Sequence, residues 1–281
     1  MENMKISIVG LGLIGGSMAI DLKKRGFAGN VIGVDNNRLH AETALHIGLV
    51  DEICGLDEAI SQSGLIILAT PADATVKLLP KILDSIDQQI VTDTCSTKEL
   101  LCQVVKYHPR RQNYVASHPM AGTEFTGPWA AFPGLFDGKA VIFCDTDETG
   151  IRALATVRRM YDSLNMRPVF MNSSSHDRHA AYVSHISHIS SFALALTVLD
   201  QEKNEKHIFD LASGGFDSTV RLAKSSAEMW SPIFSQNADN VIKVLDTYIE
   251  KLNEFKQAIT GLDSDKISEM IVNANKIKKI L

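Results

Sequence analysis

One histidine in the sequence stands where a general base is expected. His118 follows an apolar run over residues 114–117 and precedes a proline, so we expect it at the carboxyl end of a buried strand. Ligands of parallel sheets bind outside those strand ends, and an imidazole titrates near neutral pH. The alternative is an ordinary polar loop histidine.

Ser96 follows the neighbouring predicted strand and is the residue that we expect to orient His118. A simpler interpretation makes Ser96 the N-cap of a helix, because Glu99 lies three residues further on, as in a capping box. Cys95 lies beside it, and with no base adjacent in sequence we interpret this thiol as a packing residue rather than a nucleophile.

Two further histidines, His185 and His188, are three residues apart in a helical pattern and therefore share a face. Pairs at this spacing can bind a transition metal, but no acidic residue flanks them as a third ligand in the usual pattern. We therefore expect no metal and interpret the pair as the lining of a pocket for an anion.

Arg221 offers a fixed positive charge for such an anion. Its planar guanidinium can hold a carboxylate through two hydrogen bonds, whereas Lys224 offers a point charge. Either residue could equally be a solvated helix residue. Because Arg221 follows a glycine turn, we take it as the candidate for binding substrate.

The opening of the chain predicts a cofactor site. An apolar run over residues 5–9 leads into a glycine-rich turn and then into a helical pattern. Gly10 permits the turn, Gly12 lets the backbone approach a pyrophosphate, and Gly15 lets the helix lie close to the strand. The N–H groups at the start of the helix face the phosphates. The predicted cofactor contacts of this turn are Gly10, Gly12, Leu13, Ile14 and Gly15.

Asp35 ends the second apolar run, where a carboxylate meets the ribose hydroxyls of the adenosine. A carboxylate there repels a 2′-phosphate, so we expect NAD rather than NADP, with Arg38 nearby as a reason to keep the question open. Thr70 and Pro71 form another strand-to-helix turn and are candidates for backbone contact with the dinucleotide. The alternative is a strand-helix-strand unit that binds nothing.

The elements that position these residues alternate between strand and helix up to residue 171. This order predicts an α/β fold with a Rossmann-type, doubly wound parallel sheet. No strand-like run remains from Ser175 onward, and helical patterns cover residues 176–199 and 227–252. We therefore predict an NAD-binding domain over residues 1–171 and an all-α domain over residues 172–281, whose long helices suit either a lone bundle or a dimer interface.

Composition excludes several classes of protein. The 281 residues are 45% hydrophobic, which is ample for a buried core. A net charge of -5 gives no basic surface for nucleic acid, and we find no uninterrupted apolar run as long as a membrane span. The N-terminus enters a strand almost at once, so we expect no signal peptide and a cytoplasmic location. The four cysteines are scattered without metal-type spacing.

Several short sequence motifs follow one another along both predicted domains, and the first of them is the glycine turn. The others are His118-Pro-Met-Ala-Gly-Thr-Glu124, Leu135-Phe136, His176-Asp177, Ser184-His-Ile-Ser-His188, and Arg221-Leu-Ala-Lys-Ser225 with Met229-Trp230. Together they resemble the prephenate/arogenate dehydrogenase family of tyrosine biosynthesis. The resemblance implies that NAD takes a hydride from prephenate while its ring carboxylate leaves as CO₂ and 4-hydroxyphenylpyruvate forms. It also implies a homodimer through the helical domain.

Carried over to this chain, the resemblance implies a role for each candidate. His118 would hydrogen-bond the ring hydroxyl and take up its proton, and Ser96 would orient both. Arg221 would bind a substrate carboxylate. The remaining predicted substrate contacts are His188, His185 and Thr123.

Departures from the family pattern leave arogenate open as an alternative substrate. Asp217-Ser218 stands where many members have Arg-Asp, so we expect Arg221 to lack its usual carboxylate partner. Ser187 replaces a common proline, and Cys95-Ser96-Thr97 replaces a more usual Gly-Ser-Val. We expect neither a fused chorismate mutase nor a C-terminal ACT-type domain.

Two other functions fit part of the pattern. In a β-hydroxyacid-type dehydrogenase, Lys224 would be the acid/base and His118 incidental. In an NAD-binding sensor, the cofactor would bind without turnover and the helical domain would be an interaction module.

Overall fold

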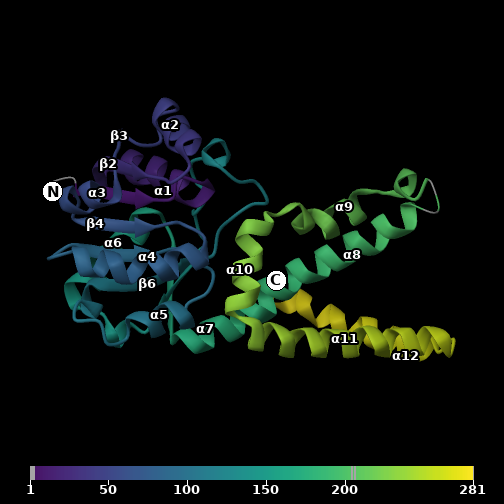
Figure 1. The fold of residues 1–281 in the computed structure, drawn as a ribbon. Helices are drawn as coiled ribbons and strands as arrows, with labels where there is room; N and C mark the ends of the chain where they lie inside the picture. The colour runs from purple at the N-terminus through teal and green to yellow at the C-terminus, as the bar shows by residue number, and fades with distance from the viewer. Residues whose placement is uncertain (1–3, 204, 206, 281) are drawn as a thin grey trace.

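The computed structural model describes residues 4–203, 205 and 207–280. Figure 1 shows an α/β part built around one sheet and a helical part that extends away from it. The strands are β1 (Met4–Val9), β2 (Ala28–Val34), β3 (Glu52–Ile53), β4 (Leu65–Leu68), β5 (Ile90–Asp93), β6 (Tyr114–Pro119), β7 (Ala140–Cys144) and β8 (Arg167–Met171). The helices of the α/β part are α1 (Leu13–Lys24), α2 (Arg38–His46), α3 (Leu56–Gln62), α4 (Ala72–Ser85), α5 (Glu99–Val105) and α6 (Ile151–Ser163).

The sheet has the strand order β3-β2-β1-β4-β5-β6-β7-β8. Apolar side chains of α1 and α6 pack on one face and those of α3, α4 and α5 on the other, so the sheet is covered on both sides. The order reverses direction between β1 and β4, and ligands of such sheets bind at this point, beyond the carboxyl ends of the strands. The glycine turn follows β1 and Thr70 follows β4, so both candidates meet there.

The predicted parallel sheet is confirmed for the first six strands and wrong at β7. Strand β7 runs antiparallel to β6, with Ile142 opposite His118, and β8 is parallel to β7. A parallel neighbour requires a crossover connection, usually a helix. The segment between β6 and β7 contains only a short 3₁₀ turn, Pro128–Ala130, and lies over α1, where Ser17 Oγ accepts the backbone N–H of Phe132 at 3.1 Å.

The helical part begins directly after β8. Its helices are α7 (Ser173–Ala180), α8 (Ile186–Glu202), α9 (Gly214–Val220), α10 (Ala227–Gln236), α11 (Ala238–Thr260) and α12 (Ser264–Ala274). A π-helical turn over Ala181–His185 joins α7 to α8. The helix predicted over residues 227–252 is two helices, because the chain breaks at the buried Asn237 between α10 and α11.

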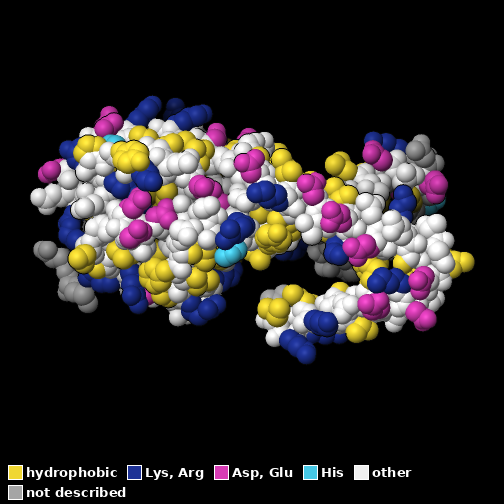
Figure 2. Space-filling view, turned by 90° about the horizontal axis from the view of Figure 1, so that it is seen from below, with side chains coloured by type: hydrophobic (Ala, Val, Ile, Leu, Met, Phe, Trp, Pro, Cys, Tyr) yellow, Lys and Arg dark blue, Asp and Glu magenta, His cyan; other side chains and the backbone are white. Residues whose placement is uncertain are grey.

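The continuous helical run Ser173–Glu202 differs from the expectation that no apolar segment is as long as a membrane span. By length and composition alone it could cross a membrane, with a mean hydropathy of 1.3 over its most apolar window, of which 11% is buried. Its first turns nevertheless bury His176, Asp177 and His185 inside the protein. Figure 2 shows one face of the molecule, on which acidic and basic side chains are interspersed and apolar side chains form several exposed patches.

Candidate active site

The glycine turn has the geometry of a phosphate cradle. Gly10 has a φ of +98°, and a β-carbon there would lie 2.5 Å from the carbonyl oxygen of Ala69. A β-carbon at Gly15 would overlap the carbonyl oxygen of Gly10, whereas one at Gly12 would meet no atom within 4 Å. Gly12 is the N-cap of α1, and neither a capping side chain nor an acidic residue occupies the first turn. The helix therefore offers unpaired N–H groups and open space to a pyrophosphate.

The other predicted cofactor residues surround this turn. Leu13 is buried and Ile14 half-buried, and both pack into the core beneath the turn. Asp35 accepts the backbone N–H of Leu11 at 2.8 Å through Oδ2 and that of Asn37 at 2.8 Å through Oδ1. Each of its oxygens keeps a lone pair for a ribose hydroxyl.

Thr70 lies beside Gly10, and Pro71, the next residue, is the N-cap of α4. Arg38 pairs with Glu42 at 2.6 Å and its side chain is 91% exposed. An exposed pair of this kind contributes little, so the preference for NAD rests on Asp35.

The contrast between Gly12 and Gly15 gives a testable prediction. We expect Gly12→Ala to keep the free energy of unfolding within about 1 kcal/mol, the size of an N-cap effect, but to weaken NAD binding by about tenfold or more, which is about 1.4 kcal/mol. We expect Gly15→Ala to lose about 1–3 kcal/mol of stability through overpacking and to lose NAD binding as well. Calorimetric NAD titration and urea unfolding measure both quantities. Unchanged NAD affinity in Gly12→Ala would contradict this assignment.

His118 lies near the carboxyl end of β6, as predicted, and is 8% exposed. Its Nδ1 atom lies 2.8 Å from Nε2 of His176. Burial, with further contributions from His176, Lys98 and His185, lowers the pKa of His118 well below its ordinary value. The ring is therefore neutral at pH 7 and available as a base.

Ser96 differs from both of its predicted roles. Its half-buried hydroxyl makes no hydrogen bond to His118 in the described part of the chain, where His176 is the partner instead. Nor is it an N-cap, because α5 begins at Glu99 after Lys98. The carboxylate of Asp177 caps this helix by accepting the backbone N–H of Lys98 at 2.7 Å and that of Glu99 at 2.9 Å.

A buried ion pair lies behind His118. Lys98 and Asp93 are both 0% exposed, and their side chains are in direct contact. Lys98 Nζ also donates to the carbonyl oxygen of Ser117 at 2.8 Å, and the hydroxyl of Tyr114 donates to Asp93 Oδ1 at 2.7 Å. No sequence signal pointed to this pair, because Asp93 ends β5 while Lys98 lies in the polar turn that follows. His176-Asp177 was visible in sequence as a His-Asp dipeptide just after the last strand, but without a role.

The helical part contributes three aromatic side chains that approach one another. His188 stacks on Trp230 with ring centroids 3.5 Å apart, and His185 lies 5.9 Å from Trp230. Nδ1 of His185 accepts from the amide of Asn237 at 3.2 Å, which leaves the proton on Nε2. His185 Nε2 and Trp230 Nε1 are buried without a partner in the described residues. Buried donors are normally satisfied, so an acceptor from a ligand or water belongs here.

Arg221 lies in a 3₁₀ turn, Arg221–Lys224, after α9. Its carboxylate partner is not Asp217, which pairs with Lys224, but Glu124, to which its guanidinium donates at 2.7 Å. Glu124 belongs to the loop after β6, as does Thr123, whose hydroxyl accepts the backbone N–H of Phe125 at 3.3 Å. This loop lines a cavity of about 480 Å³ together with Trp129. The ion pair thus joins the loop that carries Thr123 to the helical part.

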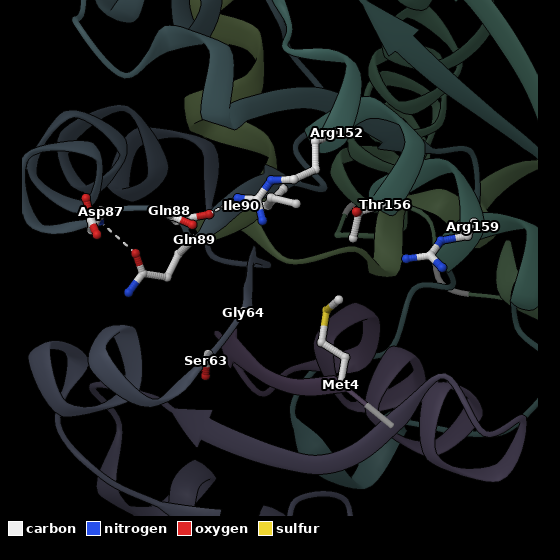
Figure 3. Close-up of a pocket in the computed structure, with 10 residues that line it drawn as sticks. All are labelled: Met4, Ser63, Gly64, Asp87, Gln88, Gln89, Ile90, Arg152, Thr156 and Arg159. Carbon is white, nitrogen blue, oxygen red and sulfur yellow. Dashed lines mark hydrogen bonds between the residues drawn. The ribbon is translucent and has the colours of Figure 1, made fainter. Parts of the chain in front are cut away.

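A second hollow, of about 590 Å³, lies at the opposite end of the strands, where their amino ends lie. Figure 3 shows Met4, Gly64 and Ile90 at the amino ends of β1, β4 and β5, facing Arg152 and Arg159 of α6. None of the predicted site residues lines it, so it is separate from the glycine turn and His118.

Residues 18–170 match the family model of the prephenate dehydrogenase nucleotide-binding domain, and residues 172–273 match that of the prephenate dehydrogenase dimerization domain. The chain belongs to the prephenate dehydrogenase family. A prephenate dehydrogenase of Bacillus subtilis is 31% identical over 284 residues, covering 95% of this chain and 74% of the relative.

Solved structures of the family agree with this assignment. Prephenate dehydrogenase from Aquifex aeolicus, in complex with hydroxyphenyl propionate and NAD⁺, has a TM-score of 0.85 at 28% identity and covers 100% of this chain and 99% of its own. Synechocystis arogenate dehydrogenase has a TM-score of 0.75 at 27% identity, with 98% and 99% covered. Family membership confirms the Rossmann-type fold with its helical domain, the dehydrogenase class and NAD as cofactor. The roles of individual site residues stay predictions.

Proposed function

We propose that this chain catalyses the NAD-dependent oxidative decarboxylation of prephenate to 4-hydroxyphenylpyruvate in tyrosine biosynthesis. The observation that carries the proposal is the neutral imidazole of His118 at the sheet edge where the glycine turn also lies, in a chain of this family. Bound NAD⁺ supplies the hydride acceptor. The side chains bind the substrate, orient it and hold the proton of its hydroxyl group.

His118 acts through Nε2, which has no hydrogen-bond partner among the described residues. This atom accepts the proton of the ring hydroxyl as the hydride leaves the same carbon. Because burial keeps the ring neutral, the base is ready at physiological pH. Ser96, half-buried on the neighbouring turn, is proposed to contact the ring hydroxyl rather than the imidazole.

The substrate is a dianion, and the helical part offers groups to hold it. Arg221 provides the fixed charge, with Glu124 as the partner that it releases or shares when a carboxylate arrives. The unsatisfied N–H groups of His185 and Trp230 are donors that a substrate oxygen or an ordered water would satisfy. His188 and Thr123 complete the proposed pocket.

The helical domain is proposed to pair two copies of the chain in the cytoplasm. The matched family domain is described as a dimerization domain. Its helices α8, α11 and α12 also expose the large apolar side chains Leu196, Leu199, Ile249, Leu252, Ile259 and Ile271. Exposed apolar area on this scale marks an interaction surface, and a second copy accounts for it without a membrane. We keep the proposed boundary between the domains at residue 171, where β8 ends.

Absorbance of the reduced cofactor, NADH or NADPH, measured with prephenate or arogenate and with NAD⁺ or NADP⁺, tests the proposed function. We expect rapid turnover with prephenate and NAD⁺, because prephenate dehydrogenases are among the most similar relatives and Asp35 stands at the ribose position. Faster turnover of arogenate would reassign the substrate. NAD binding with no turnover of either ring acid would favour the sensor.

A further inference from the structure

His118 is the first member of a buried chain of hydrogen bonds that ends on a carboxylate. Its Nδ1 atom lies 2.8 Å from Nε2 of His176, and Nδ1 of His176 lies 2.7 Å from Oδ1 of Asp177. All three side chains are at most 8% exposed. They come from both parts of the molecule, since β6 carries His118 and α7 carries the other two.

Asp177 determines which nitrogen carries the proton in each ring. An ionised carboxylate only accepts hydrogen bonds, and here it also accepts the backbone N–H groups of Lys98 and Glu99. Nδ1 of His176 is therefore the donor toward Asp177, and Nε2 of a neutral His176 is an acceptor. Nδ1 of His118 must donate to it. A lone pair is left on Nε2 of His118, where a base needs it.

We propose that His176 is a positioning residue that fixes His118 in this tautomer, and that it receives the Nδ1 proton of His118 while Nε2 takes the proton of the substrate hydroxyl. The inference rests on the proposed function. It assigns to the helical part a direct influence on the base, although the base itself lies on the sheet.

The relay moves two protons and returns both. As the hydride leaves with its electron pair for NAD⁺, the substrate O–H bond breaks and an N–H bond forms at Nε2 of His118. The Nδ1–H bond of His118 breaks, and a new N–H bond forms at Nε2 of His176. Loss of CO₂ then leaves an electron pair in the ring, and the ring oxygen recovers its proton from His118 while Nδ1 recovers the other from His176.

The charges around the two rings favour this direction. His118 faces Lys98, which is paired with Asp93, and also His185; Lys98 and His185 both lower the pKa of His118. A positive charge transferred to His176 lies instead in contact with the carboxylate of Asp177. The relay therefore carries the charge away from a site that disfavours it.

Nitrogen-15 NMR of the full chain with labelled histidine rings tests the tautomer directly. We expect the His118 signals, assigned by their loss in His118→Asn, to show a proton on Nδ1 and none on Nε2. In His176→Leu we expect a mixture of tautomers. A wild-type His118 that carries its proton on Nε2 overturns the proposal even if neither His176 variant folds.

Kinetics of two substitutions test the proton transfer. Glutamine places a hydrogen-bond acceptor near the position of His176 Nε2 but cannot take up a proton. Leucine offers no acceptor and cannot take up a proton. We expect kcat/KM for prephenate to fall about tenfold in His176→Gln and about 10³-fold in His176→Leu, with NAD affinity unchanged. We also expect the acid limb of the kcat/KM profile to move to higher pH in His176→Leu, because a group that lowers the pKa of His118 is gone.

Wild-type rates and pH profiles in both variants would overturn the role of His176. A wild-type chain that does not turn over prephenate would instead refute the proposed function, so the two failures are distinguishable. His179, on the same helix and without contact to His118 in the described residues, provides the control substitution His179→Leu.

Discussion

Replacement of His118 by asparagine is expected to lower kcat/KM for prephenate by about 10²–10⁴-fold, the usual contribution of a positioned general base. The asparagine amide can still donate to His176, so the fold and the NAD site are retained while the base at Nε2 is lost. Steady-state NADH formation measures the effect. In the wild type we expect kcat/KM to be independent of pH at pH 6.5 and above. The pKa of His118 is lowered, so the imidazole is protonated and inactive as a base only in more acidic solution.

Lys224→Ala is the matched control for this loss. Lys224 pairs with Asp217 at 3.0 Å on the surface of the helical part, and in a β-hydroxyacid-type dehydrogenase it would be the acid/base. We expect it to retain activity within a few-fold. Full activity in His118→Asn together with loss in Lys224→Ala would reverse the assignment of the base.

Replacement of Lys98 by methionine is expected to lower the free energy of unfolding by about 3–5 kcal/mol, the usual effect of leaving a buried charge without its partner. Both Lys98 and Asp93 are fully buried, so solvent does not compensate Asp93 once the ammonium group is removed. Urea unfolding followed by circular dichroism measures the change. The free energy of NAD binding should change less than the free energy of unfolding, because Lys98 makes no hydrogen bond to the glycine turn or to Asp35 in the described residues.

Two further variants separate the lost charge from lost packing. Asp93→Asn combined with Lys98→Met removes both charges, and we expect this double variant to be more stable than Lys98→Met alone. Lys251→Met breaks an exposed pair with Glu254 and should change stability by less than about 1 kcal/mol. Equal losses in Lys98→Met and Lys251→Met would show that the buried pair does not stabilise the fold.

The structure of the glycine turn, the proposed cofactor site, was predictable because its determinants are local. The turn from Gly10 to Gly15 needs only a strand, a helix and glycines at fixed spacing. In the structure Gly10 has a positive φ, and a β-carbon at Gly10 or Gly15 would clash with a backbone carbonyl oxygen. The position of His118 near the end of β6 was likewise readable, because a buried strand followed by proline is a short-range pattern.

The partners of these residues were not predictable, since they come from distant parts of the sequence. Ser96 has the spacing of a capping box, yet Asp177 caps the same helix from 79 residues away from Lys98. An ionised carboxylate with two oxygens satisfies two N–H groups at a helix N-terminus, where one hydroxyl satisfies one. The antiparallel β7 and the break at Asn237 also depend on tertiary contacts that periodicity does not record.

The position of Asp177 has a consequence for recombination. This one side chain closes a helix of the α/β part and holds the imidazole that contacts His118. A chimera that grafts a foreign helical half onto residues 1–171 would leave that helix end open and the base in an unassigned tautomer, unless the graft brought its own His-Asp dipeptide. We therefore expect the two halves to function only when they are exchanged together.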